Sequence, residues 1–134
     1  LAAAAAAAIP LTQRELAQSV TFATGHFADG DGLDWQAFAR PRHTVVFYMG
    51  VAQMEHIVSR LLSAGAPRER PAAIVERATL PGERVLRGSL GDIASLARAE
   101  RVTAPALLII GEAAAAERGN VVIQTLTEAL RGVA

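Results

Sequence analysis

Cysteine is absent from the 134-residue sequence. Disulfide frameworks, thiolate zinc sites, iron–sulfur clusters and cysteine nucleophiles are therefore excluded within these residues. Lysine is absent as well, because all 13 basic residues are arginine, and this excludes a Schiff base or a lysine general base. A sequence without cysteine fits a reducing compartment, and we expect a cytoplasmic protein.

Long apolar runs and an excess of one charge are also absent. No run approaches the roughly 20 apolar residues that cross a bilayer, and the segment 1–9 lacks the basic start of a signal peptide. The formal net charge is +0, with 51% hydrophobic and 19% charged residues, which is the balance of a globular domain. We therefore expect one domain that binds neither membranes nor nucleic acids.

Motifs for phosphate and metal binding are missing. No G-x-x-x-x-G-K-[ST] is present and no G-x-G-x-x-G follows a predicted strand, so chemistry on nucleoside triphosphates or NAD has no support. Asp29 begins a pattern that resembles a calcium loop, but its twelfth position is Arg40 where a glutamate is required. The three histidines are far apart in the sequence: His26, His43 and His56. This spacing predicts no metal site.

Hydrophobic patterning predicts alternating strands and helices. The expected strands are 19–24, 44–48, 72–76, 84–88 and 106–110; the expected helices are 2–8, 34–39, 51–62, one that starts near residue 91, and 121–130. The β-branched and aromatic run at 44–48 is typical of a strand buried on both faces. The alternation predicts an α/β domain whose largely parallel or mixed β-sheet is flanked by helices.

Residues that follow strands are the first candidates for a binding site, because ligands of open α/β sheets bind beyond the carboxyl ends of the strands. Three dipeptides hold this position in the sequence: Met49-Gly50, Ala78-Thr79 and Gly111-Glu112. Glycine or alanine permits a close approach of ligand to backbone, and methionine offers a polarizable surface to an adenine or a sulfonium. The pattern alone leaves open the alternative that Met49 fills the core.

Five ordered blocks of the sequence carry a resemblance to a known family. They are Ile-Pro-Leu-Thr-Gln-Arg at 9–14, Ala-Gln-Ser-Val at 17–20, Thr-Gly-His at 24–26, Leu-Asp-Trp at 33–35 and Thr-Val-Val-Phe-Tyr-Met-Gly at 44–50. In this order and spacing they resemble the uroporphyrinogen-III C-methyltransferases, including the methylase part of siroheme synthase. The likeness continues to residue 112 and leaves only the two ends of the chain outside it.

The resemblance implies a methylase that uses S-adenosylmethionine (SAM), releases S-adenosylhomocysteine (SAH) and converts uroporphyrinogen III to precorrin-2 without a metal. Family members are homodimers of subunits with two α/β domains that hold the cofactor between them. We expect 1–10 to be the end of a helix or linker from a preceding domain, 11–112 to be the C-terminal α/β domain and 113–134 to be a helical tail. The proposed acid and base of the family lie in the first domain, so we assign no catalytic residue here and predict that these 134 residues alone are inactive.

The family pattern also suggests cofactor contacts. Met49, with the adjacent Tyr48, corresponds to the methionine block that touches SAM. Ala78 stands where the family commonly has a glycine near the cofactor, and Thr79 is the threonine that follows it. The extra methyl group of Ala78 shifts the expected approach of the backbone without excluding it.

Two further residues are candidates for substrate binding. Arg14 has a guanidinium that can fork onto a carboxylate of the tetrapyrrole, and His26 follows a strand and a glycine at the expected crevice. Gln13 stands where the family usually has histidine. Two alternatives remain open: a non-catalytic α/β module that binds a nucleoside-like ligand, and another tetrapyrrole methylase that acts on a precorrin.

Overall fold

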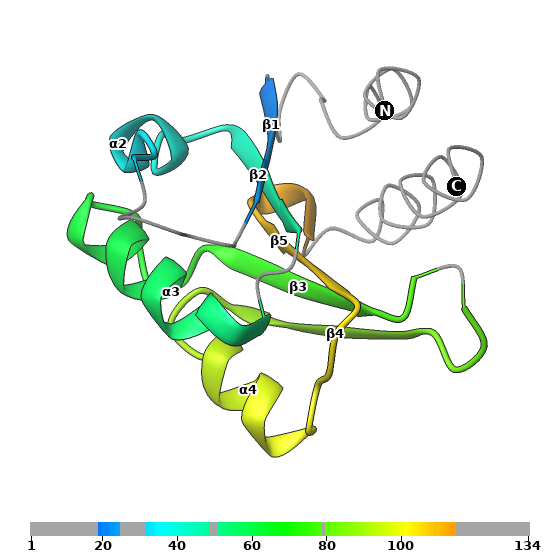
Figure 1. Cartoon of the computed structure of the whole chain (residues 1–134). Coiled ribbons are helices and arrows are strands. Elements are labelled where there is room, and N and C mark those ends of the chain that lie inside the picture. Colours follow the sequence, from blue (N-terminus) through cyan, green and yellow to red (C-terminus); the bar gives the residue numbers. More distant parts are fainter. Residues whose placement is uncertain (1–18, 25–31, 49–50, 79, 115–134) are drawn as a thin grey trace.

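The computed structural model describes residues 19–24, 32–48, 51–78 and 80–114. Its strands are β1 (Ser19–Thr24), β2 (His43–Tyr48), β3 (Pro71–Glu76), β4 (Arg84–Ser89) and β5 (Ala106–Ile110). Its helices are α2 (Trp35–Phe38), α3 (Met54–Ser63) and α4 (Ile93–Ala99), with 3-10 turns η2 (Val51–Gln53) and η3 (Glu112–Ala114). Every strand and helix expected within these residues is present (Figure 1), and those expected at 2–8 and 121–130 lie outside them.

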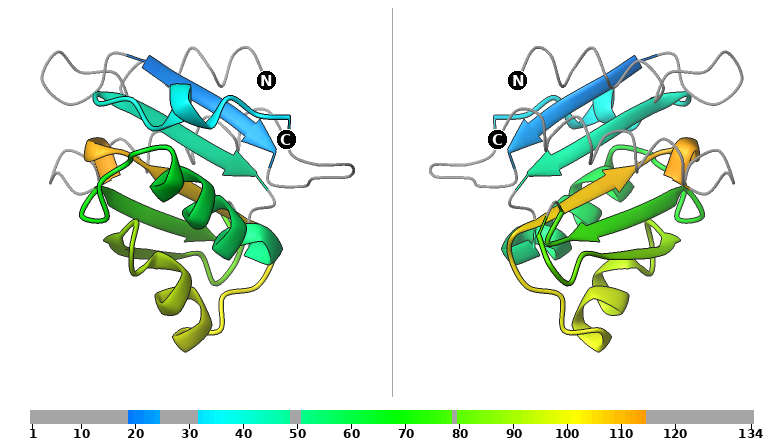
Figure 2. Two further views of the ribbon diagram at one scale, coloured as in Figure 1. Left: turned by 90° about the vertical axis from the view of Figure 1, so that its left-hand side faces the viewer. Right: turned by 90° about the vertical axis from the view of Figure 1, so that its right-hand side faces the viewer.

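The strands form one mixed sheet in the order β1-β2-β5-β3-β4. β1 and β2 are parallel, whereas β5 is antiparallel to both β2 and β3, and β4 is antiparallel to β3. β1, β2 and β3 therefore run in one direction and finish at the same end of the sheet, which we call its carboxyl end (Figure 2). β4 and β5 begin there, as the pairs Glu76 with Arg84 and Tyr48 with Leu107 show. The expected α/β domain with a mixed sheet is confirmed.

One expectation about the strand ends is wrong. Because β5 runs against its neighbours, Gly111 and Glu112 follow it at the opposite end of the sheet and do not share the crevice of the other two dipeptides. Gly111 lies against the start of β2, where a Cβ atom would come within 3.1 Å of the carbonyl oxygen of His43. Its φ of 147° and this close approach explain why glycine occupies the position.

The described helices α2, α3 and α4 cover one face of the sheet, as the left view of Figure 2 shows. The apolar stripe of α3 (Met54, Ile57, Val58 and Leu61) is buried there, as its spacing predicts. The Trp35 ring stacks on Phe47 of β2 at a centroid distance of 5.9 Å. Local signals set the helix ends, because the Asp34 carboxylate caps the first turn of α2 and Gly65, with φ 103°, ends α3.

The opposite face, which we call the second face, carries its own buried cluster. Its buried members are Val46, Ala73, Val75, Leu107, Ile109 and Ala114, and Val20, Phe22, Tyr48, Ala78 and Val85 pack against them. Burial on both faces explains why β2, β3 and β5 have nearly continuous apolar sequences. The second face is the one on which two of the predicted cofactor residues lie.

Candidate functional site

The carboxyl end of the sheet brings together the segments that the sequence singles out. Tyr48 is the last residue of β2, and Ala78 follows the end of β3 by two residues. Both side chains pack in the cluster on the second face. Four other predicted site residues lie outside the described residues: Arg14, His26, Met49 and Thr79. The structure therefore places two of the six predicted residues, and it places them on the same side of the sheet.

Tyr48 combines an anchored ring with a hydroxyl group that lacks a partner. The ring is half-buried and stacks on Phe22 of β1 at a centroid distance of 6.0 Å and an interplanar angle of 27°. Its hydroxyl oxygen is buried and accepts or donates no hydrogen bond within the part of the chain that the structure describes. Burial raises the pKa of the phenol, so the group is a neutral donor and acceptor. Buried polar atoms in folded proteins nearly always have a partner, so an unpaired one requires an explanation such as a bound water or a ligand atom.

Ala78 lies in a loop, residues 77–83, that joins β3 to β4. The preceding residue, Arg77, has a left-handed φ of 55°, and its N–H donates to the carbonyl of Pro105 at 2.7 Å. The Arg77 guanidinium donates back to the carbonyl of Pro81 at 2.9 Å, and the N–H of Leu80 donates to the carbonyl of Arg77 at 2.9 Å. The loop that carries Ala78 is thus held by hydrogen bonds within the loop and by one to Pro105.

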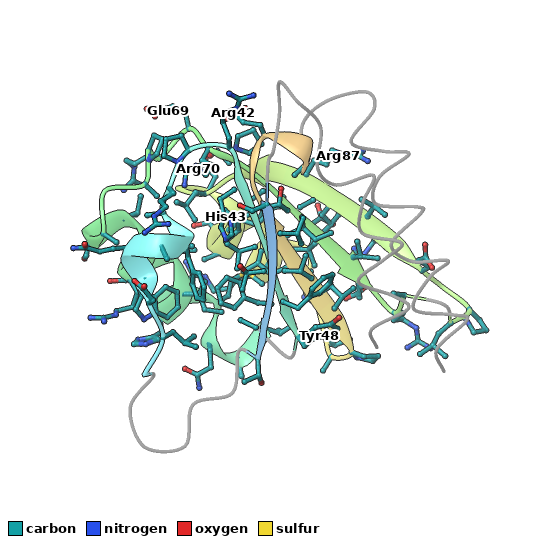
Figure 3. All side chains as sticks on the ribbon, turned by 90° about the horizontal axis from the view of Figure 1, so that it is seen from above. Arg42, His43, Tyr48, Glu69, Arg70 and Arg87 are labelled. Atoms are coloured by element: carbon teal, nitrogen blue, oxygen red, sulfur yellow. The ribbon has the colours of Figure 1, made fainter. Side chains whose placement is uncertain are left out.

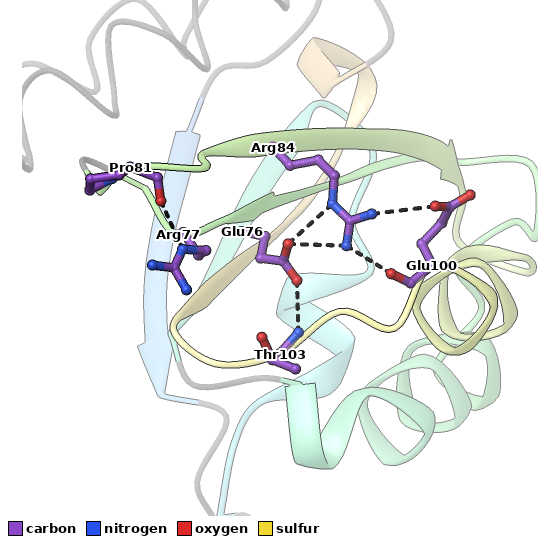
Figure 4. Close-up of polar contacts among 6 residues, drawn as sticks. All are labelled: Glu76, Arg77, Pro81, Arg84, Glu100 and Thr103. Carbon is purple, nitrogen blue, oxygen red and sulfur yellow. Dashed lines mark hydrogen bonds and ion pairs between the residues drawn. The ribbon is translucent and has the colours of Figure 1, made fainter.

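A buried carboxylate stands at the base of this loop (Figure 4). Glu76, only 6% exposed, accepts a hydrogen bond from the Nε of Arg84 at 3.1 Å and another from the N–H of Thr103 at 2.8 Å. Its carboxylate also forms an ion pair with the Nη2 of Arg84 at 3.0 Å. The N–H of Thr103, and next to it the Arg84 guanidinium, hold the pKa of Glu76 below its usual value despite burial. Glu76 is not among the site residues predicted from the sequence. Its available signal was a carboxylate that ends an otherwise apolar strand.

A second polar cluster surrounds His43 at the other end of β2 (Figure 3). Its ring nitrogens lie 2.5 Å from the Ser19 hydroxyl and 3.0 Å from the Thr21 hydroxyl. Burial, with the charges of Arg40 and Arg70, lowers the pKa of His43 and favours its neutral form. The length of β2 separates this cluster from Tyr48.

Other features of the described structure do not include the predicted site residues. A cavity of about 310 Å³ lies between the start of α3 and the end of α4, with Met54, Arg98 and Val102 in its lining, and contains none of the predicted residues. Within the described ranges, no group of three or more histidines or carboxylates could hold a metal ion. No described helix is long and apolar enough to cross a membrane.

Comparison with known proteins identifies the family. The model of the tetrapyrrole (corrin/porphyrin) methylases matches residues 1–94, and the chain belongs to this family. The match begins at residue 1 and so includes the alanine-rich segment 1–8, which lies outside the five residue blocks that resemble the family.

Individual relatives point to the same branch of the family. The chain is 48% identical over 109 residues to the siroheme synthase of Pseudoalteromonas translucida, in an alignment that covers 81% of this chain and 23% of that protein. The native uroporphyrin-III C-methyltransferase of Thermus thermophilus superposes with a TM-score of 0.65 at 35% identity, over 84% of this chain and 46% of that one. The predicted resemblance is confirmed.

A structure of the same Thermus enzyme in complex with S-adenosylhomocysteine matches equally well. Its TM-score is 0.65 at 37% identity, over 77% of this chain and 44% of that one. The chain thus spans about a quarter of the siroheme synthase and less than half of each Thermus methyltransferase.

Proposed function

We propose that the chain is the C-terminal half of a SAM-dependent methylase that converts uroporphyrinogen III to precorrin-2. The observation that carries the proposal is the hydroxyl of Tyr48, which is buried without a hydrogen-bond partner among the described residues, on the same face as Ala78 at the carboxyl end of the sheet. The support from relatives is the 48% identity to a siroheme synthase and the SAH-bound state of a methyltransferase with the same fold.

The residues at the carboxyl end fit the cofactor. An adenosyl group needs an apolar surface with a small number of polar partners. The stacked rings of Tyr48 and Phe22 offer such a surface, and the Tyr48 hydroxyl offers the polar partner. We assign Met49 and Thr79, which follow these positions in sequence, to the same cofactor.

SAM, when bound, supplies an electrophilic methyl group. A pyrrole carbon of the tetrapyrrole forms the new C–C bond as the sulfur–methyl bond breaks, and a proton leaves the macrocycle. This reaction depends on alignment and proton removal more than on an enzymic nucleophile. We assign Arg14 and His26 to binding of the substrate, and Arg14 to one of its carboxylates, which an arginine binds as a fork.

The proposal includes the organisation of the whole protein. Residues 1–10 are the end of a helix or linker, 11–112 the C-terminal α/β domain and 113–134 a tail, and the domain that precedes them supplies the acid and base. The complete enzyme is a cytoplasmic homodimer. These 134 residues alone do not catalyse methyl transfer.

The test compares the full-length natural protein that contains this chain with the 134-residue chain alone. Intact mass first establishes the length of each sample, and calorimetric titration then measures the affinity for SAH. Transfer of the labelled methyl group of SAM to uroporphyrinogen III is measured last. We expect binding and transfer only by the full-length protein.

Each other outcome has a distinct meaning. Methyl transfer by the isolated chain refutes the two-domain proposal. SAH binding by the full-length protein without transfer to any tetrapyrrole indicates a non-catalytic module. Transfer to a precorrin but not to uroporphyrinogen III indicates another methylase of the family.

A further inference from the structure

The carboxylate of Glu76 makes two separate attachments with its two oxygens. Oε1 accepts a hydrogen bond from the Nε of Arg84 and forms an ion pair with its Nη2, and Oε2 accepts a hydrogen bond from the N–H of Thr103 (Figure 4). Arg84 is the cross-strand partner of Glu76 in the β3–β4 hairpin. Thr103 belongs to the segment between α4 and β5. The carboxylate therefore ties three separate pieces of backbone together at one point.

The loop 77–83 leaves from this point. Arg77 is the residue after Glu76, and its N–H donates to Pro105, two residues beyond Thr103. The hydrogen bond between Glu76 and Thr103 thus sets the distance between Arg77, where the loop starts, and Pro105, whose carbonyl accepts from the Arg77 N–H. Arg77 also holds a left-handed φ of 55°, a strained geometry that a non-glycine residue keeps only when its surroundings impose it.

We propose that Glu76 is a positioning residue for the cofactor site. It fixes the start of the loop that joins β3 to β4, and through the loop it places Ala78 relative to Tyr48. The inference rests on the proposed function, because that function makes this loop one wall of the SAM site. Glu76 does not contact the cofactor; it acts only through the backbone.

An ionised carboxylate is required for this role. Both oxygens of Glu76 face N–H donors, so a glutamine amide has to turn its NH₂ group toward either Arg84 or Thr103. The hydrogen bond to that residue is then lost, because the NH₂ group of the glutamine faces another N–H donor. Glu100 is a suitable control, because it binds the same guanidinium at 3.3 Å but is largely exposed and makes no contact with Thr103 that the structure records.

The experiment uses the full-length natural protein and the variants Glu76→Gln, Glu100→Gln and Val58→Ala. Val58 is buried on α3, on the helix-covered face, so its truncation lowers stability away from the loop. The readouts are the calorimetric Kd for SAH, the Tm, and hydrogen exchange of the peptide 77–83. We expect Glu76→Gln to weaken SAH binding about tenfold and to speed exchange in 77–83. Both controls keep the wild-type Kd, although Val58→Ala lowers the Tm.

The outcomes separate the inference from the proposed function. An unchanged Kd and unchanged exchange in Glu76→Gln overturn the inference, and so does an equal loss of affinity in Val58→Ala. If the wild type binds no SAH but Glu76→Gln still speeds exchange in 77–83, the proposed function fails while the role of Glu76 in holding the loop stands. If Glu76→Gln does not fold, Arg84→Lys replaces it, since it keeps the charge and gives up the fork, and an unchanged Kd and exchange in that variant likewise refute the inference.

Discussion

The hydroxyl of Tyr48 is the most direct place to test the cofactor site. Tyr48→Phe removes one oxygen and keeps the ring that stacks on Phe22. The same strand offers a matched control, because the Thr44 hydroxyl is also buried without a partner among the described residues. Thr44 lies near the start of β2 and Tyr48 at its end, so Thr44→Val makes the same kind of change away from the site.

The expected magnitudes follow from the burial of these hydroxyl groups. A buried hydroxyl without a hydrogen bond destabilises the fold by about 1–3 kcal/mol relative to a paired one. Without ligand, the free energy of unfolding of both variants should therefore equal that of the wild type or exceed it by about 1 kcal/mol. A hydrogen bond from the Tyr48 hydroxyl to the cofactor contributes about 0.5–1.5 kcal/mol, so Tyr48→Phe should weaken SAH binding by about 2- to 12-fold.

Urea unfolding and calorimetric titration with SAH of the full-length natural protein measure both quantities. We expect Thr44→Val to keep the wild-type affinity. Because the raised pKa keeps Tyr48 protonated, the affinity difference between wild type and Tyr48→Phe should persist from neutral pH to about pH 10. Loss of stability in Tyr48→Phe, or an affinity equal to that of the wild type, would refute the reasoning.

Two further predictions concern the opposite end of the sheet. Gly111→Ala combines an unfavourable φ of 147° with a Cβ atom 3.1 Å from the His43 carbonyl, and should lower the free energy of unfolding by about 2–4 kcal/mol. Gly65→Ala, at φ 103° with nothing within 4 Å of the added Cβ atom, should lower the free energy of unfolding by about 1 kcal/mol. If urea unfolding shows the same loss of stability in both variants, the argument from the close contact at Gly111 is wrong. The lowered pKa of His43 means that the fold favours its neutral form, so the stability it contributes is present above its usual value of 6.5 and is lost as the pH falls below 6.5. His43→Gln should flatten the decline in Tm between pH 7 and pH 5, and an unchanged slope in His43→Gln counts against the assignment.

The sequence by itself determined the local elements and the family. The run from Thr44 to Tyr48 is apolar on both faces because the sheet has a buried cluster on each side, and this condition is visible in the order of residues alone. The stripe of α3 and the stop at Gly65 are equally local. Residue blocks in a fixed order were enough to identify a methylase resemblance, which the family match confirms.

Only the tertiary structure decided how these elements are arranged and which polar groups meet. Hydrophobic periodicity reports which faces of a strand are buried, but not the direction of the strand or its neighbours. β5 inserts between β2 and β3 against their direction, and this removed Gly111 from the site that the sequence analysis expected. Glu76 meets an N–H donor 27 residues away at Thr103, and the Tyr48 hydroxyl meets none among the described residues. Such partnerships form between segments distant in the chain, so no local pattern of residues encodes them.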